Sequence, residues 1–364
     1  MKRKKRQLAA VFTAIALLLG GCSAHTPTSS STAQPTESAP TSPVQEEQTV
    51  ITNENSILTN GGAMVELSSL EHYSANSGST VYYTSELTSA AMVQIYNALG
   101  WTPIGKVAVK LSTGEPPASN YLDPELIKGV VQAVNGTIVE CNTAYGGSRA
   151  STAAHLQVAE DHGFTAIADV DIMDADGSMS LPVTGGARLT ENFVGTHFSD
   201  YGSFVVLSHF KGHAMAGFGG AIKNISIGIA SSEGKAHIHS GGTGGSMWSA
   251  DQNSFLESMA EAGKSVSDSL ESGANIVYIS VMNRISIDCD CDGHPAEPDI
   301  HDIGILASTD PVALDQACVD LVGVADGNEA LMNRIADRNG LLILQHAEEI
   351  GLGSRSYRLA DINA

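Results

Sequence analysis

The sequence predicts an α/β protein with a largely parallel sheet and helices on both faces. Short apolar runs alternate along the chain with longer segments whose apolar residues recur every three or four positions, a pattern typical of strands joined by helices. Such alternation requires crossover connections, which pack helices against both faces of the sheet. With 364 residues, 42% of them hydrophobic, the chain can build one large α/β unit or two lobes.

The expected elements follow from these periodicities in chain order. Strands are expected at residues 106–111, 137–140, 165–170, 203–208, 275–281 and 303–307. Helices are expected at residues 87–99, 123–134, 151–162, 255–270, 310–322 and 339–350. Ligand sites in such sheets form at the carboxyl ends of strands, so the loops after Leu111, Glu140, Ser208 and Val281 are the places to search.

The first fifty residues have the features of an exported lipoprotein. A basic start and an apolar run from Leu8 to Leu19 indicate a secretory leader over residues 1–21. The ending Leu-Gly-Gly-Cys resembles the lipobox of bacterial lipoproteins, which implies acylation of Cys22. Residues 22–50 are rich in Ser, Thr and Pro and are expected to form a disordered tether. We therefore expect a cell-membrane anchor through Cys22, with the protein on the extracytoplasmic face.

The remaining chain divides into an irregular lead-in at residues 51–80 and an α/β domain at residues 81–364. The formal net charge of −21 argues against nucleic acid as a partner, because phosphates are neutralised by basic surfaces. It also argues against contact with anionic lipid headgroups, so acyl groups on Cys22 are the expected contact with the bilayer.

One Gly-rich stretch after the strand at 203–208 gathers basic and imidazole side chains. Gly217, Gly219 and Gly220 allow a ligand to approach the backbone, although their spacing fits neither standard phosphate loop. In an extended chain His237 and His239 point to the same side, as metal ligands do. The whole set is His209, Lys211, His213, Lys223, His237 and His239. The alternative is that these histidines lie on the surface or serve as hydrogen-bonded spacers.

A second stretch joins thiols to carboxylates. Cys289 and Cys291 are followed by His294, and together they offer ligands suited to zinc, iron or copper. The neighbouring acids, Asp288, Asp290, Asp292 and Asp299, favour a cation. The alternatives are a local disulfide or an acidic solvated loop. Of the other cysteines, Cys318 has the helical spacing of a core residue, so a disulfide framework is not indicated.

Several blocks resemble the domain-of-unknown-function 362 family. They are Gly105–Leu111, Ser208–His213, Gly217–Asn224, Cys289-Asp-Cys291 and the segment Asp299–Cys318, and the resemblance extends over about residues 82–359. Members of this family often carry a ferredoxin-like insert for iron–sulfur clusters, so the resemblance implies redox chemistry. This chain departs from the pattern, because residues 240–245 are Gly-rich and no multi-cysteine run follows.

A more distant likeness is to nickel-pincer lactate racemases. It rests on the spacing of His213, Lys223 and His239, and implies that His213 is a general base, Lys223 a covalent or anion-binding group, and His239 a nickel ligand. With Lys211, these give the candidate catalytic set His213, Lys223 and Lys211. His209, His237, His239, Cys289, Cys291 and His294 are candidate ligands for iron, zinc or nickel.

Two classes of function follow from these observations. One is a metal-dependent or redox enzyme that uses the His/Lys stretch together with Cys289 and Cys291. The other is a membrane-tethered protein that binds a metal or a small anionic ligand without catalysis. The site in either class exists only if the two stretches meet at one edge of the sheet.

Overall fold

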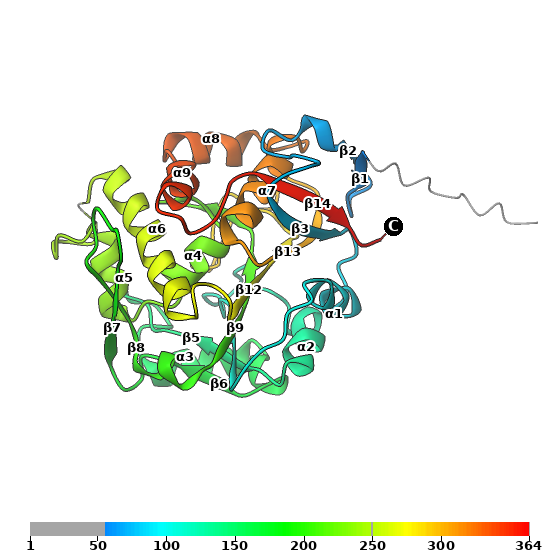
Figure 1. Cartoon of the computed structure of the whole chain (residues 1–364). Coiled ribbons are helices and arrows are strands. Elements are labelled where there is room, and N and C mark those ends of the chain that lie inside the picture. Colours follow the sequence, from blue (N-terminus) through cyan, green and yellow to red (C-terminus); the bar gives the residue numbers. More distant parts are fainter. Residues whose placement is uncertain (1–54, 249, 364) are drawn as a thin grey trace, which may run out of the picture. The chain divides into compact units, whose positions relative to one another are not determined.

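A computed structural model of the chain describes residues 55–248 and 250–363 (Figure 1). The expected leader, Cys22 and the tether lie outside these residues. None of the described helices is long and apolar enough to cross a membrane. The described residues belong to one compact unit, so the alternative of two lobes is not seen in them.

The described residues build a mixed sheet of eight strands. In spatial order these are β14 (Tyr357–Asp361), β3 (Ser79–Thr84), β13 (Gly304–Ser308), β12 (Ile276–Met282), β9 (Ser203–His209), β4 (Val107–Lys110), β5 (Thr137–Glu140) and β6 (Val170–Ile172). Only β13 runs antiparallel to its neighbours, β12 and β3, and the other adjacent pairs are parallel. The largely parallel sheet predicted from the sequence is confirmed.

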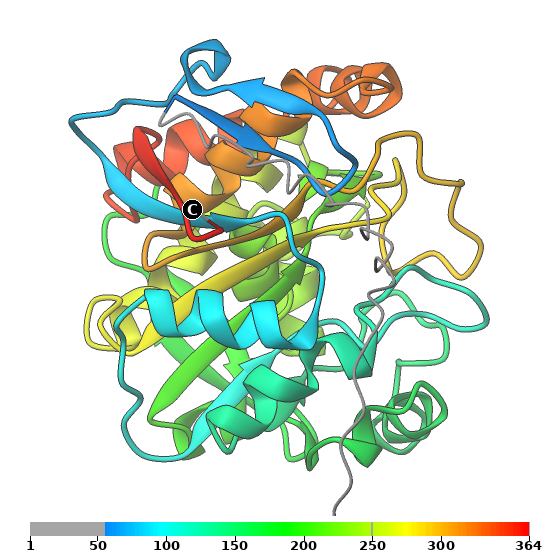
Figure 2. The ribbon, with the colours of Figure 1, turned by 90° about the vertical axis from the view of Figure 1, so that its right-hand side faces the viewer.

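Helices cover both faces of this sheet (Figure 1). One face is covered by α1 (Ser89–Ala98), α2 (Pro124–Ala133) and α3 (Thr152–Asp161), and Figure 2 looks onto α1 and α2. The other face carries α4 (Ala221–Ser226), α5 (Ser232–His239), α6 (Gln252–Ser269), α7 (Pro311–Gly323), α8 (Glu329–Asp337) and α9 (Leu342–Glu349).

Side chains of the central strands point alternately into two separate hydrophobic cores. On β9, Val205 and Leu207 pack with α1–α3, whereas Phe204 and Val206 pack with α4, α6 and α7. A buried strand in the centre of a sheet is apolar on both faces, which explains the unbroken apolar run at 204–207.

Helix starts follow the capping chemistry expected from the sequence. The Asp123 carboxylate accepts the backbone N–H of Glu125 ahead of Pro124, the first residue of α2. The Asp310 carboxylate likewise accepts the N–H groups of Val312 and Ala313 at the start of α7. These caps fix the points at which the chain leaves the sheet and turns back over it.

The differences from the predicted elements have local causes. The strand expected at 165–170 is a short 3₁₀ helix (Phe164–Ala166) followed by β6, because Gly163 adopts a left-handed conformation that ends α3. The lead-in is not irregular throughout: its described part contains the hairpin of β1 (Ser56–Leu58) and β2 (Met64–Glu66) and the start of β3. Two further hairpins join β7 (Ser178–Pro182) to β8 (Glu191–Gly195) and β10 (Lys211–His213) to β11 (Gly217–Gly219).

Candidate functional site

A cavity of about 290 Å³ opens at the carboxyl ends of β4, β5 and β9. Its walls come from the segments after Leu111, Glu140 and Ser208 and from the segment that follows β12, the four places indicated by the sequence. The loop after β4 also touches the loop after β12, because Glu115 N–H donates to the Asp290 carbonyl at 2.8 Å (Figure 2).

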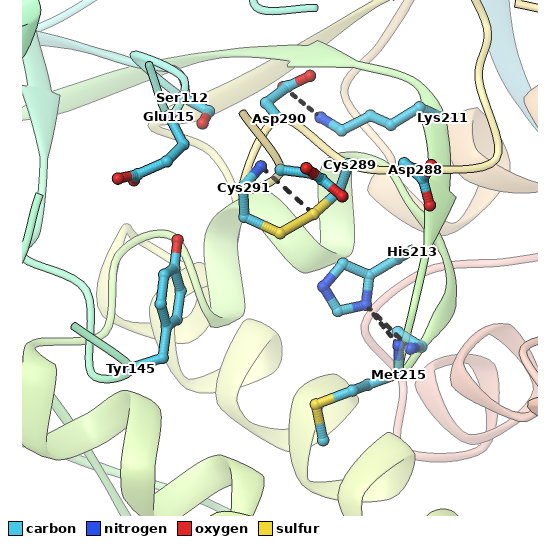
Figure 3. The surroundings of a disulfide bond; sticks show 12 residues. Ser112, Glu115, Tyr145, Lys211, His213, Met215, Asp288, Cys289, Asp290 and Cys291 are labelled. Carbon is cyan, nitrogen blue, oxygen red and sulfur yellow. Dashed lines mark hydrogen bonds and ion pairs between the residues drawn. A yellow bond between two sulfur atoms is a disulfide. The ribbon is translucent and has the colours of Figure 1, made fainter. Parts of the chain in front are cut away.

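The His/Lys stretch and the Cys/Asp stretch meet at this rim (Figure 3). The Lys211 Nζ lies 2.6 Å from Asp290 Oδ2, and His209 Nδ1 lies 2.9 Å from Asp290 Oδ1. The three side chains are buried. Burial opposes ionisation of Asp290, but Lys211 and His209 outweigh it and hold the pKa of this carboxyl well below its ordinary value.

The contacts of Asp290 with Lys211 and His209 correct two predictions made from the sequence. The second ring nitrogen of His209 donates to the Asn283 carbonyl at 2.7 Å, so both ring nitrogens face oxygen acceptors and neither has a lone pair free for a metal. Lys211 was expected to be catalytic, but its ammonium is bound to Asp290 and does not line the cavity. Both residues position the turn that carries the cysteines.

His213 faces the cavity as a hydrogen-bond donor. Its Nδ1 accepts the backbone N–H groups of Ala216 at 2.9 Å and Met215 at 3.3 Å, so in the neutral ring the proton is on Nε2. Burial, and then the charge of Lys223, hold the pKa of His213 well below its ordinary value and keep the ring neutral. The expected role as general base does not fit this geometry, because the Nε2 lone pair is already protonated.

His239 has the opposite hydrogen-bond polarity, because its free ring nitrogen is an acceptor. Its Nδ1 donates to the Lys235 carbonyl at 2.7 Å, which leaves the Nε2 lone pair free at the cavity wall. Burial lowers the pKa of His239 to about 4, so this nitrogen is an unprotonated acceptor at neutral pH. His239 is therefore able to bind a metal or accept a proton.

The pairing of His237 with His239 as joint ligands was wrong. Both lie on α5, a helix that begins when Ser231 Oγ accepts Gly234 N–H, rather than on an extended segment. Residues two apart on a helix point to different sides. His237 packs edge-on against Phe193 and does not line the cavity.

Lys223 places an amine in the cavity from α4. No hydrogen-bond partner lies near its Nζ within residues 55–248 and 250–363. Burial, followed by the charge of Lys211, lowers the pKa of Lys223 to about 7. Near neutral pH the Lys223 side chain is therefore present both as a cation and as a nucleophilic amine.

A second charged network forms the floor of the cavity around Glu140. This carboxylate accepts hydrogen bonds from Thr113 N–H at 2.7 Å and Arg149 Nη1 at 3.2 Å, and lies 3.5 Å from Lys110 Nζ. Burial opposes its ionisation, but Lys110, His155 and Arg149 hold its pKa well below the ordinary value. Nearby, Lys235 Nζ donates to the carbonyls of Ala230 and Cys141.

The sequence analysis missed the residues of this floor. Lys110 interrupts an apolar strand and Glu140 ends one, and a charged residue at the end of a buried strand is the signal that points to them. Arg149 and Lys235 carried no such signal. The exposed Trp248 and Tyr145, which line the cavity mouth, lie on segments without strong periodicity.

Cys289 and Cys291 form a disulfide, one of the alternatives that the sequence left open (Figure 3). One ligand atom from each cysteine and one from His213 lie within 4.8 Å of one another, so the reduced pair could hold a metal ion with this imidazole. The expected partner His294 is not part of this group and lies exposed on the following loop. Of the other described cysteines, Cys141 and Cys318 are buried free thiols.

The three glycines proposed as a cofactor cradle do not line the cavity. A Cβ on Gly217 would lie 3.1 Å from Gly340 Cα, and a Cβ on Gly220 would collide with the Asp315 carboxylate. These two positions require glycine because other parts of the chain approach closely. A Cβ on Gly219 would make only ordinary contacts with the side chains of Lys223 and Lys211.

The fold and the cavity define an α/β protein with a ligand site at the carboxyl rim of its sheet. Residues 107–320 match the model of a family described as a domain of unknown function, DUF362. Because this match spans more than half of the sequence, the chain belongs to the DUF362 family, as its sequence blocks indicated. A comparison with curated proteins finds no match.

Two solved structures show distant similarity. One is the apoprotein of the lactate racemase from Thermoanaerobacterium thermosaccharolyticum, with 15% identity and a TM-score of 0.40 over 73% of this chain and 61% of that one. The other is a protein from Thermotoga maritima, with 11% identity and a TM-score of 0.34 over 72% of this chain and 58% of that one. The chain thus spans less than two thirds of either protein. A lactate racemase is among the matches, as expected from the sequence, but scores this low give no information about activity.

Proposed function

We propose that this protein is a membrane-anchored, extracytoplasmic enzyme that acts on a small anionic molecule in the cavity, using metal-dependent or redox chemistry at Cys289, Cys291 and His213. The observation that carries the proposal is the amine of Lys223, which has no hydrogen-bond partner among residues 55–248 and 250–363. It lies in a cavity also lined by His213 and His239, whose hydrogen-bond polarities are opposite, and by Cys291 of the disulfide. Free donors and acceptors converging on one small pocket are typical of active sites.

The charge of the cavity supports an anionic ligand. Its walls contain the cations Lys110, Arg149, Lys223 and Lys235 against the carboxylates Glu140 and Asp290. Both carboxylates are already neutralised by contacts with cations, which leaves excess positive charge. A basic pocket in a protein with a net charge of −21 is a local feature that attracts anions.

The residues around the ligand have separate chemical tasks. His213 Nε2–H can donate to an anionic oxygen, and His239 Nε2 can accept a proton. Lys223 can bind a carboxylate or phosphate as a cation, or react as an amine. Apolar contacts from Met215 and Met247 and the ring of Trp248 limit access of water at the mouth.

The donor set fits a metal ion once the cysteine pair is reduced. Thiolate sulfur and imidazole nitrogen are ligands preferred by zinc, iron and nickel, and a bound ion would supply Lewis-acid chemistry toward an anionic oxygen. An imidazole that ligates through Nε2 has its proton on Nδ1. His213 Nδ1 now accepts the Ala216 N–H, so metal loading requires the 214–216 backbone to move.

The membrane anchor is part of this proposal. The lipobox-like ending at Cys22 and the tether at 22–50 would hold the α/β domain near a membrane through acyl chains. A disulfide between Cys289 and Cys291 supports an extracytoplasmic location, because such bonds persist in oxidising compartments.

Ligand binding can be tested by titrating the full-length protein, in detergent, with succinate and with inorganic phosphate. Tryptophan fluorescence is a suitable signal because Trp248 lines the cavity, while the second tryptophan, Trp101, donates to Ala274 elsewhere and can be replaced by Phe. Saturable binding that is lost in Lys223→Gln but kept in Lys128→Gln is expected. Lys128, on α2, has a side chain that is 41% exposed and serves as the charge-matched control.

Metal binding can be tested separately with Co²⁺, whose absorption spectrum reports thiolate ligands. The reduced protein should show sulfur-to-cobalt charge transfer that is absent from the oxidised protein and from Cys291→Ser. If anions bind but neither metal binding nor thiol chemistry is found, the protein is the non-catalytic binding module of the alternative class. If no anion binds, the proposal is wrong.

A further inference from the structure

We infer that the cavity admits a small anionic thiol, which attacks the disulfide at Cys291. This inference rests on the proposed function and names its substrate class: a low-molecular-weight thiol that carries at least one carboxylate. Three observations lead to it, namely the access to one sulfur, the anchoring of the turn between the cysteines, and the charge around the pocket.

Only one of the two sulfur-bearing residues faces the ligand. Cys291 lines the cavity and is half-buried, whereas Cys289 is 4% exposed and does not line it. Thiol–disulfide exchange depends on which sulfur the incoming thiolate can reach. The geometry therefore makes Cys291 the attacked sulfur and Cys289 the leaving group.

The leaving sulfur has a hydrogen-bond donor. The backbone N–H of Cys291 donates to Cys289 Sγ at a distance of 3.3 Å. A fixed N–H stabilises the negative charge that develops on the departing sulfur. The neutral ring of His213 lies beside the same bond, with one of its nitrogens within 4.8 Å of both sulfurs (Figure 3).

The residue between the cysteines is held independently of the disulfide. Asp290 is bound by Lys211 and His209 through its carboxylate, and its carbonyl accepts Glu115 N–H. Breaking the sulfur–sulfur bond leaves these contacts in place. The two thiols then stay close together, so the pair can open and close without rearrangement of the turn.

The surrounding charges select for an anion. Glu140 and Glu115 balance Lys110 and Arg149, so the excess positive charge comes from Lys235, whose ammonium is bound to carbonyls, and from Lys223, whose amine has no partner in the described chain. The acids beside the cysteines, Asp288 and Asp292, do not line the cavity. A carboxylate on the incoming thiol thus meets net positive charge as its sulfur approaches Cys291.

The exchange balances without any further reactant. The ligand's thiol loses its proton to solvent water or to the free Nε2 of His239, while the Lys223 ammonium stays available for the ligand's carboxylate. Its sulfur then bonds to Cys291 Sγ, and the electron pair of the broken disulfide leaves with Cys289. A second thiol attacks the mixed disulfide and releases the ligand as a symmetrical disulfide. Two ligand thiols are oxidised, and the protein disulfide becomes a dithiol.

The test compares three thiols of similar size: 3-mercaptopropionate, 2-mercaptoethanol and cysteamine, which are anionic, neutral and cationic. The full-length oxidised protein is mixed with each at equal thiolate concentration and quenched with acid, and the mixed disulfide is located by peptide mass spectrometry. We expect the anionic thiol to react about tenfold or more faster than the cationic one, with the adduct on Cys291. Equal rates, or an adduct on Cys289, would overturn the inference.

Two controls separate this inference from the proposed function. Lys223→Gln should reduce the preference for the anionic thiol, while Lys128→Gln should leave it unchanged. On the wild-type protein, succinate should slow the reaction of 3-mercaptopropionate by competing for the cavity, which tests the claim without a variant. If succinate binds but does not slow the exchange, the anion site stands and the thiol inference fails.

Discussion

Lys211 Nζ and Asp290 Oδ2 lie 2.6 Å apart, although the two residues are separated by 79 positions in the sequence. Both side chains are buried, and such a pair is costly to break because one partner is left as an unpaired charge. This contact fixes the cysteine turn against the strand that leads to His213, and it brings the two reactive stretches of the sequence into one site.

Replacing Asp290 should therefore destabilise the protein. Asp290→Asn leaves Lys211 and His209 buried without their counter-charge, which should cost about 3–5 kcal/mol of unfolding free energy. Denaturant unfolding of the full-length protein measures this loss. Asp288→Asn, two residues away and half-buried, should cost less than about 1.5 kcal/mol because it loses one hydrogen bond, to Ala296 N–H. Equal losses in the two variants would show that the contacts of Asp290 with Lys211 and His209 do not stabilise the fold.

The two buried carboxylates, Asp290 and Glu140, predict that the protein is sensitive to acid. The pKa values of Asp290 and Glu140 are depressed in the folded protein, so their contribution is complete above the ordinary values of 3.8 and 4.5. It is lost as the pH falls below those values, because protonation is then favoured in the unfolded chain. Because Glu140 is present in both proteins, unfolding free energy should decline more steeply in the wild type than in Asp290→Asn below about pH 3.8, where Asp290 begins to be protonated in the unfolded chain. Parallel curves would contradict this assignment.

Anion affinity should fall as the pH rises through about 7. The Lys223 ammonium has its pKa lowered to about 7 and loses its charge over this interval, whereas His239, with a pKa of about 4, stays neutral throughout. Succinate titrations at pH 6 and pH 8 should differ by several-fold. Lys223→Gln should bind no succinate at either pH, and residual binding whose affinity still changes between pH 6 and pH 8 would assign the titration to another group.

His213 and His239 should show opposite tautomers by nuclear magnetic resonance. Nitrogen-15 spectra at neutral pH should place the unprotonated nitrogen of His213 at Nδ1 and that of His239 at Nε2. His213→Gln and His239→Gln assign the two signals by their disappearance. Matching tautomers would contradict the division into one donor and one acceptor.

Membrane attachment depends on a single residue if the lipobox assignment is right. Cys22→Ser should move the protein from the detergent phase to the aqueous phase in a Triton X-114 partition, because the described helices contain no membrane span. Retention of the Cys22→Ser protein in the detergent phase would rule out acylation of this residue as the anchor.

The sequence predicted the fold well where periodicity was strong. The buried strands at 203–208 and 275–281 and the capped helix at 123–134 agree with the structure within one or two residues. The prediction failed for the segment that contains His237 and His239, which the sequence analysis treated as extended and which lies in α5. Gly234, in the first half of this helix, is needed because a Cβ there would meet the Phe193 carbonyl.

The candidate site was predicted only in part, because several of its features depend on tertiary contacts. The sequence identified His213, Lys223 and His239, and the structure brings them to one cavity. It gave no information on hydrogen-bond polarity, which depends on contacts such as Lys235 O to His239 Nδ1. The floor around Glu140 was missed because its partners come from two separate segments, one with Lys110 and Thr113 and one with Arg149 and His155, that only the folded sheet brings together.

Competitive labelling of amines is the most direct test of the central claim, that Lys223 receives the anion. The full-length protein is treated with a trace of acetic anhydride at pH 7, with and without succinate, and acetylation of each lysine is measured by mass spectrometry. We predict that Lys223 is labelled readily, because a substantial fraction of its amine is neutral at this pH, and that succinate binds the charged fraction and protects it while Lys128 is unaffected. Labelling of Lys223 that saturating succinate does not change would contradict the account.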